Sequence, residues 1–179
     1  MFAGRLDEVK GIVFLIQAFR KVLETYKNAR LLIAGDGSFN RWMKEAKDIW
    51  SQVIFTGRIE KEVLYELYHI ADMGIVCSLH EEFGFVAIEM MMNQLPVIVS
   101  DTGGLSEIVE NGISGLKIPV MNDGKQQVID VDALSAKMIQ LIEQPDYAKV
   151  LAVNARKRFL EKYDLTIFRQ KILNLYREI

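Results

Sequence analysis

Several kinds of residue and segment are scarce in this chain of 179 residues. It contains 1 cysteine and 3 prolines. The single cysteine, Cys77, cannot form an internal disulfide and suits a reducing compartment. The longest unbroken apolar run, from Ile12 to Ile16, is far shorter than a membrane span, and no signal peptide precedes it. These absences predict an intracellular globular protein without membrane-spanning segments.

Neither positive nor negative charge is in clear excess. The 22 basic and 24 acidic residues leave a formal net charge of −2. A nucleic-acid binder of this size would normally be clearly basic, so we expect no nucleic-acid partner. The 2 histidines and the single cysteine stand at unrelated positions, which predicts no metal site. No Gly-x-Ser-x-Gly motif is present, so the sequence does not indicate a covalent hydrolase.

Apolar residues, by contrast, are plentiful. They make up 50% of the chain, enough to form a sizeable core and to exclude a disordered protein. The length fits a single domain covering residues 1–179.

Short apolar runs alternate with longer segments of helical period. Most of the runs are unbroken, as expected for strands covered on both faces. Strands that alternate with helices indicate βαβ units and a mostly parallel sheet. The predicted strands are Met1 to Ala3, Arg30 to Ala34, Val53 to Thr56, Met73 to Cys77, Pro96 to Val99 and Gly115 to Ile118.

The pattern changes after Pro119. Residues 120–131 are polar and contain the turn-forming sequence Asn122-Asp123-Gly124. Three helices with no strand between them are predicted to follow, over residues 132–143, 145–162 and 166–177. Pro145 suits the first turn of its helix, and Asp164 or Thr166 is expected to cap the last one.

Ligands of parallel sheets bind where the carboxyl ends of the strands lead into helices. In the first loop of this kind, Arg5 and Lys10 precede a helix whose N-terminus favours anions. Two cations there suit a diphosphate, although spacing alone favours the alternative that both are solvated surface charges. In the second loop, Gly35 and Gly37 permit close approach of a ligand or simply a tight turn. Asn40 stands where a dinucleotide fingerprint has its third glycine, so a nicotinamide cofactor is not favoured.

The third loop is the most informative. Gly84 is predicted to start a helix, which leaves the backbone N–H groups of Phe85 and Val86 free for an anion. Two carboxylates flank this anion site, Glu81 before the helix and Glu89 inside it. They would repel phosphates unless they reach past them to neutral sugar hydroxyls; the alternative is that both face solvent.

Two further features belong to this group of loops. Glu89 lies in an otherwise apolar stretch, where a charge needs a partner. In a fourth loop, the pair Gly103-Gly104 precedes a helix and forms either a second anion cradle or a bare turn.

Several segments of the chain occur in a fixed order: Gly4-Arg5-Leu6, Lys10-Gly11, Ala34-Gly35-Asp36-Gly37, Phe55-Thr56-Gly57, Glu81-Glu82-Phe83-Gly84, Leu95-Pro96-Val97-Ile98, Gly103-Gly104-Leu105-Ser106-Glu107 and the Glu-x7-Glu spacing of Glu81 and Glu89. Taken in order, these segments resemble a known family, the retaining GT-B glycosyltransferases of the "glycosyl transferases group 1" (family 4) type. The resemblance covers nearly the whole chain and corresponds to the donor-binding, C-terminal half of such enzymes. It implies a Rossmann-like three-layer α/β/α fold with a mostly parallel six-stranded sheet and a helical C-terminus.

The resemblance also implies roles. Arg5 and Lys10 would bind the diphosphate of a nucleotide-diphosphate sugar, and Glu81 would contact the donor sugar. Glu89 would hold the ribose hydroxyls, and the loop around Arg58 and Ile59 would meet the base. No cofactor and no metal would be needed, because cations and a helix dipole replace the metal.

The resemblance further implies a partner domain. An N-terminal domain would bind a sugar or lipid-linked acceptor, would account for any peripheral membrane association of a cytoplasmic enzyme, and would pack against the final helices, about residues 145–179. The abrupt start, with strand residues at Met1 to Gly4, is consistent with such a domain preceding the chain. The alternatives are a GT-B-like sugar-nucleotide epimerase and a non-catalytic nucleotide-binding or interaction module.

One departure from the family pattern concerns the backbone. Gln94 replaces the glycine usual before Leu95-Pro96, where a left-handed helix cap is expected. We therefore expect Asn93 to adopt that conformation instead.

Overall fold

The computed structural model describes residues 1–177, apart from the side chain of Lys171. All six strands predicted from the apolar runs are present, and each of their ends differs from the prediction by one residue at most. All of them pair in parallel. They are β1 (Phe2–Ala3), β2 (Leu31–Ala34), β3 (Val53–Gly57), β4 (Gly74–Val76), β5 (Val97–Ser100) and β6 (Leu116–Ile118).

The strands form two three-stranded ladders, ordered β1-β2-β3 and β4-β5-β6, so the expected six-stranded sheet is not continuous. The ladders adjoin at β1 and β4, where the backbone N–H of Ile75 donates to the carbonyl of Met1 at 2.9 Å. β1 is only two residues long, and the chain then turns toward β2, with the N–H of Gly4 donating to Ala34. The strand order across the molecule is therefore β3-β2-β1-β4-β5-β6, and it reverses between β1 and β4.

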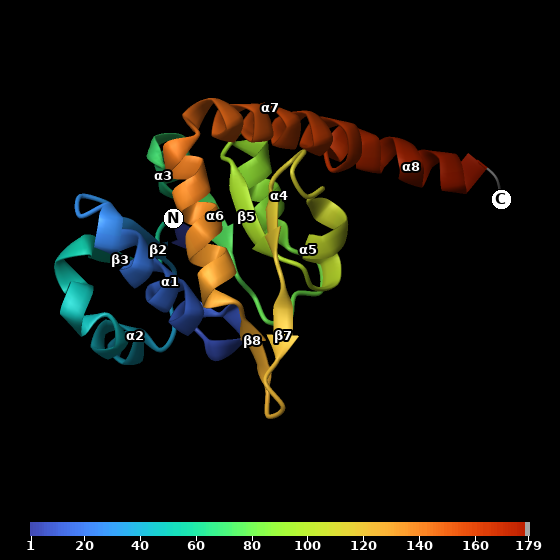
Figure 1. Cartoon of the computed structure of the whole chain (residues 1–179). Coiled ribbons are helices and arrows are strands. Elements are labelled where there is room, and N and C mark those ends of the chain that lie inside the picture. The colour runs from blue at the N-terminus through green and yellow to red at the C-terminus, as the bar shows by residue number, and fades with distance from the viewer. Residues whose placement is uncertain (178–179) are drawn as a thin grey trace.

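Helices cover both faces of the strands, which gives the expected three-layer α/β/α arrangement (Figure 1). On one face lie α1 (Ile12–Thr25) and α6 (Val131–Glu143); on the other lie α3 (Lys61–Ile70), α4 (Phe85–Met92) and α5 (Gly103–Ile108). The helix α7 (Pro145–Lys162) contributes to both faces: Ala148 and Leu151 pack into the core beneath α1 and α6, and Ala155 and Phe159 into the core beneath α4 and α5. Alternate strand residues enter the two cores, since a strand points successive side chains to opposite faces.

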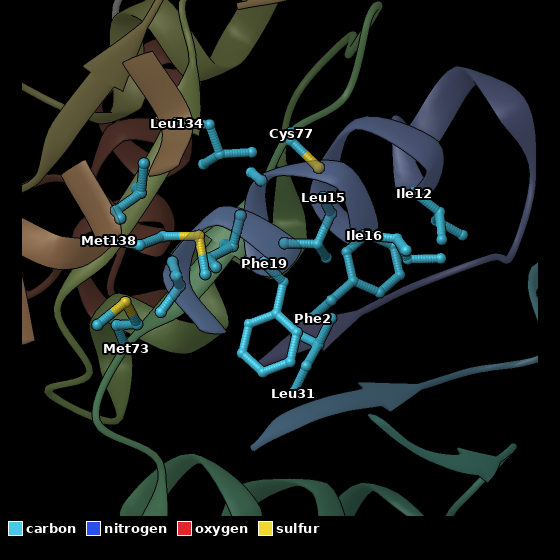
Figure 2. Packing of buried hydrophobic residues seen from close by; sticks show 14 of the residues in the cluster. Phe2, Ile12, Leu15, Ile16, Phe19, Leu31, Met73, Cys77, Leu134 and Met138 are labelled. Carbon is cyan, nitrogen blue, oxygen red and sulfur yellow. The ribbon is translucent and has the colours of Figure 1, made fainter. Parts of the chain in front are cut away.

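The first of these cores is shown in Figure 2, where Phe19 of α1 lies near the strand residues Phe2 and Leu31, and Met138 of α6 lies at the other side of the cluster, near Met73. Ile98 of β5 belongs to this core, whereas its neighbours Val97 and Val99 belong to the other.

The polar stretch after Pro119 is a β-hairpin, which the sequence pattern did not predict. Its antiparallel strands are β7 (Val120–Asn122) and β8 (Gln127–Ile129), and the predicted turn joins them. The other elements without a predicted counterpart are η1 (Glu8–Lys10), α2 (Phe39–Glu45) and η2 (Lys47–Gln52).

The last two helices agree with their predictions. The helix α7 begins at Pro145, and α8 (Leu165–Arg177) follows it. Asp164 caps α8 by accepting the N–H of Thr166 at 2.8 Å. Across the described residues, none of the helices is long and apolar enough to cross a membrane.

The prediction for Asn93 is wrong. Asn93 has a φ of −90°, and Gln94 itself adopts the left-handed conformation, with a φ of +56°. The N–H of Gln94 donates to Met91 and that of Leu95 to Met90, the hydrogen-bond pair of a Schellman cap. The residue after the helix cap must be left-handed to make these bonds, so Gln94 takes the position of the usual glycine.

Candidate functional site

The loops that follow β1 and β4 meet where the strand order reverses. Lys10 ends η1 in the first loop, and its Nζ lies 2.6 Å from Oε2 of Glu81 in the second. The hydroxyl of Ser78 donates to the same oxygen at 3.2 Å. The side chains of Lys10 and Glu81 are only 22% and 17% exposed, so the pair is shielded from water. Open parallel sheets bind ligands at such a reversal point.

Close backbone packing holds the first loop in place. Gly11 has a φ of +70°, and a Cβ at this position would lie 2.0 Å from the carbonyl oxygen of Cys77. Cys77 itself is buried in the core, and burial raises the pKa of its thiol to about 12. A thiol of that pKa is not a nucleophile at neutral pH.

The N-terminus of α4 opens beside Glu81. Gly84 is the N-cap of this helix, with a φ of +100°, and a Cβ there would contact Leu105 at 2.7 Å. The helical hydrogen bonds of α4 begin with Ile88, whose N–H donates to the carbonyl of Gly84 at 3.3 Å. The N–H groups of Phe85 and Val86 therefore lie in the first turn, where a helix has no internal acceptors for its donors.

Gly103 and Gly104 form the first turn of α5 and pack against the loop that carries Glu81. A Cβ on Gly103 would lie 1.9 Å from the carbonyl oxygen of Glu81, and one on Gly104 would lie 2.3 Å from that of Phe83. The N–H of Gly104 donates to the carbonyl of Glu81 at 3.0 Å, so this donor is already engaged. The two glycines therefore let α5 pack closely against the Glu81 loop, and this packing holds the loop in place.

A pocket of about 520 Å³ lies at the ends of β1 and β2 and gathers five of the predicted site residues. The glycines in it allow two loops to touch, since a Cβ on Gly35 would lie 1.8 Å from the carbonyl oxygen of Gly4. Arg5 lines this pocket, whereas Lys10 pairs with Glu81. The Arg5 side chain is 78% exposed, and its Nε lies 3.1 Å from Oδ2 of Asp7. The predicted site residues lining the pocket are Arg5, Gly35, Gly37, Arg58 and Ile59.

Glu89 has the partner that its apolar surroundings require. Its Oε1 lies 3.3 Å from Nζ of Lys61, at the start of α3. Lys61 was not among the residues predicted from the sequence, because nothing in its spacing relates it to Glu89. Nearby, Tyr68 is buried, and its hydroxyl has no hydrogen-bond partner within the described part of the chain. Desolvation, reinforced by the charge of Glu89, raises the pKa of this phenol, so Tyr68 is neutral at physiological pH.

The predicted residues thus form two neighbouring groups, the Lys10–Glu81 pair beside α4 and the pocket of Arg5 and Arg58. Among residues 1–177, no three His, Cys, Asp or Glu side chains are grouped closely enough to hold a metal ion.

This topology, with loops converging at a reversal of strand order, defines a Rossmann-like α/β domain. The sequence profile of the family described as "Glycosyl transferases group 1" matches residues 1–158. The chain belongs to this family.

Individual relatives agree with the assignment. An uncharacterized glycosyltransferase of Methanocaldococcus jannaschii is 31% identical over 99% of this chain, which covers 44% of that protein. The structure of HepE from Anabaena in complex with UDP superposes with a TM-score of 0.85, at 22% identity, over 99% of this chain and 48% of HepE. The C-terminal domain of a group 1 glycosyltransferase from Francisella tularensis, solved on its own, gives a TM-score of 0.77 at 22% identity, over 92% of this chain and 86% of that one. The chain spans about half the length of the curated relatives that it matches.

Proposed function

We propose that this chain binds the nucleotide-diphosphate sugar of a glycosyltransferase that transfers the sugar to an acceptor. The observation that carries the proposal is the shielded Lys10–Glu81 pair at the reversal point, between the open N-terminus of α4 and the pocket of Arg5 and Arg58. The site thus offers cations and helix N–H groups for a diphosphate, and carboxylates for hydroxyls. The structures of HepE with UDP and with UDP-glucose support this class of ligand.

The proposed roles follow the positions of the residues. Lys10, Arg5 and the N–H groups of Phe85 and Val86 bind the diphosphate and stabilise it as a leaving group. Glu81 accepts hydrogen bonds from the donor sugar, and Glu89 accepts them from the ribose. The base enters the pocket beside Arg58 and Ile59.

Further parts of the proposal concern the whole enzyme. We propose a cytoplasmic, family 4 enzyme that retains anomeric configuration, requires no metal, and receives its sugar or lipid-linked acceptor from an N-terminal domain. Family membership and the cationic donor site support this proposal.

The test is calorimetric titration of the chain with UDP, GDP, ADP and their glucose or mannose conjugates. Lys10→Ala and Glu89→Ala should each weaken both the nucleoside diphosphate and its sugar conjugate about 10- to 100-fold, the equivalent of about 1.5–3 kcal/mol for a hydrogen bond to a charged group. Glu81→Ala should weaken only the sugar conjugate, since the variant retains Lys10 for the diphosphate.

Circular dichroism of each variant controls for folding. Equal weakening of both ligands by Glu81→Ala would contradict the sugar contact. If the chain bound none of the nucleotides in the panel, the proposed function itself would be contradicted.

A further inference from the structure

One face of α3 is directed at Glu89. Lys61, Tyr65 and Tyr68 stand at positions i, i+4 and i+7 of this helix and so share one side of it. Nζ of Lys61 lies 3.3 Å from Oε1 of Glu89 and 5.4 Å from the centroid of the Tyr65 ring. The Tyr65 ring in turn stacks on Tyr68, with centroids 6.1 Å apart. Lys61 is therefore held between a carboxylate and an aromatic face.

This contact changes what Glu89 can offer a ligand. The Glu89 side chain is 26% exposed and lies in the apolar helix α4, where an unpaired carboxylate is costly. An ammonium on Oε1 offsets the negative charge and leaves Oε2 available to accept hydrogen bonds.

The same segment also shapes the proposed nucleotide pocket. Arg58 and Ile59 directly precede α3, and Leu64 lies within it; all three line the pocket of about 520 Å³. The segment that contributes these pocket residues therefore also supplies the ion-pair partner of Glu89.

We propose that Lys61 is a positioning residue for nucleotide binding: it orients the Glu89 carboxylate toward the ribose hydroxyls. The proposal rests on the ribose role given to Glu89 under the proposed function. Because Lys61 is 61% exposed, its effect is modest and sensitive to salt.

The test compares UDP with 2′,3′-dideoxy-UDP in calorimetric titrations of the 179-residue chain, or GDP with its dideoxy analogue if GDP binds more tightly in the nucleotide panel. Lys61→Met should weaken binding of the ribonucleotide about 2- to 5-fold, the range of an exposed ion pair, and leave binding of the dideoxy analogue unchanged. Lys61→Arg should restore most of the loss, and 0.5 M NaCl should reduce it.

Lys157→Met is the matched control, because Lys157 also makes an exposed ion pair, with Glu161 of α7, away from the site. Equal weakening of both nucleotides by Lys61→Met would overturn the proposal, since Lys61 would then act on the diphosphate by charge alone. Unchanged or tighter ribonucleotide binding would also overturn it.

The Glu89→Ala variant distinguishes the ribose role of Glu89 from the positioning role of Lys61. If Glu89→Ala weakens the ribonucleotide and its dideoxy analogue equally, the ribose role in the proposed function is wrong. If Glu89→Ala removes the preference for the ribonucleotide and Lys61→Met does not reduce it, only the role of Lys61 is wrong.

Discussion

Each of the two carboxylates proposed to contact the sugar nucleotide is paired with a lysine from a distant part of the chain. Glu81 pairs with Lys10, and Glu89 with Lys61. The apolar neighbours of Glu89 predicted that it needs a partner, but not which one, since an ion pair formed by tertiary packing leaves no spacing pattern in the sequence. Lys10 and Glu81 were both predicted site residues, yet only the fold shows that they touch.

The left-handed Gln94 leads to a prediction about stability. The left-handed conformation costs a non-glycine residue about 1–2 kcal/mol, and part of that is offset because glycine loses more chain entropy on folding. Gln94→Gly should therefore raise the free energy of unfolding by about 0.5–1 kcal/mol, measured by urea denaturation.

Gln144→Gly provides the control for the Gln94 variant. Gln144 is also exposed and follows a helix, but its φ is −121°, so the same substitution there relieves no left-handed strain. Gln144 is also the N-cap of α7, a position that accepts glycine, so Gln144→Gly should not gain the stability expected for Gln94→Gly. An equal or larger gain in stability in Gln144→Gly would refute the strain assigned to Gln94.

At the scale of the elements, the strands with an unbroken apolar run were predicted from the sequence, whereas elements without such a run were missed. Unbroken apolar runs located β1 to β6, because most of these strands are buried on both faces. The exception is the edge strand β3, whose Ile54 is 47% exposed. The hairpin of β7 and β8 was missed, since the residues of its exposed strands carry no such pattern. The short helix α2 was missed as well, although its Trp42 is buried. The break between the two ladders arises from the brevity of β1, which apolar pattern alone does not reveal.

The packing of α5 on the Glu81 loop makes a prediction about ligand binding. A methyl group on Gly104 would collide with backbone atoms of Phe83 and Glu82, at 2.3 and 2.7 Å, so the loop must move. Gly104→Ala should cost about 1–3 kcal/mol of stability. It should also weaken binding of the sugar conjugate more than that of the free nucleoside diphosphate, because the loop carries Glu81. Calorimetric titration of both ligands measures the difference.

Gly74→Ala separates loop displacement from general destabilisation. Its added methyl group would meet the side chains of Met90 and Leu95, at 2.4 and 3.0 Å, at the start of β4 and away from the loop. This variant should lose stability and keep the relative affinities of the two ligands. A similar loss of sugar-conjugate affinity in both variants would contradict the role of the Gly104 contact.

On the scale of the whole molecule, the two ladders are joined more by side chains than by backbone hydrogen bonds. The core beneath α1 and α6 combines Leu31 and Ile33 of one ladder with Ile98 and Leu116 of the other. Burial of apolar surface is the dominant favourable contribution to folding, so a shared core couples the two halves.

The shared core predicts that the ladders unfold together. Trp42 is 1% exposed and packs beside the β1-β2-β3 ladder, whereas Trp50 is 73% exposed. In a Trp50→Phe variant, fluorescence therefore reports on Trp42 alone, while far-UV circular dichroism reports on the helices and strands of the whole chain. The two urea transitions should have the same midpoint. UDP at about 100 times its dissociation constant should shift both equally, by about 2.7 kcal/mol, because the proposed ligand bridges loops from the two ladders. A fluorescence transition that preceded the dichroism transition, or that alone responded to UDP, would show that the first ladder unfolds separately.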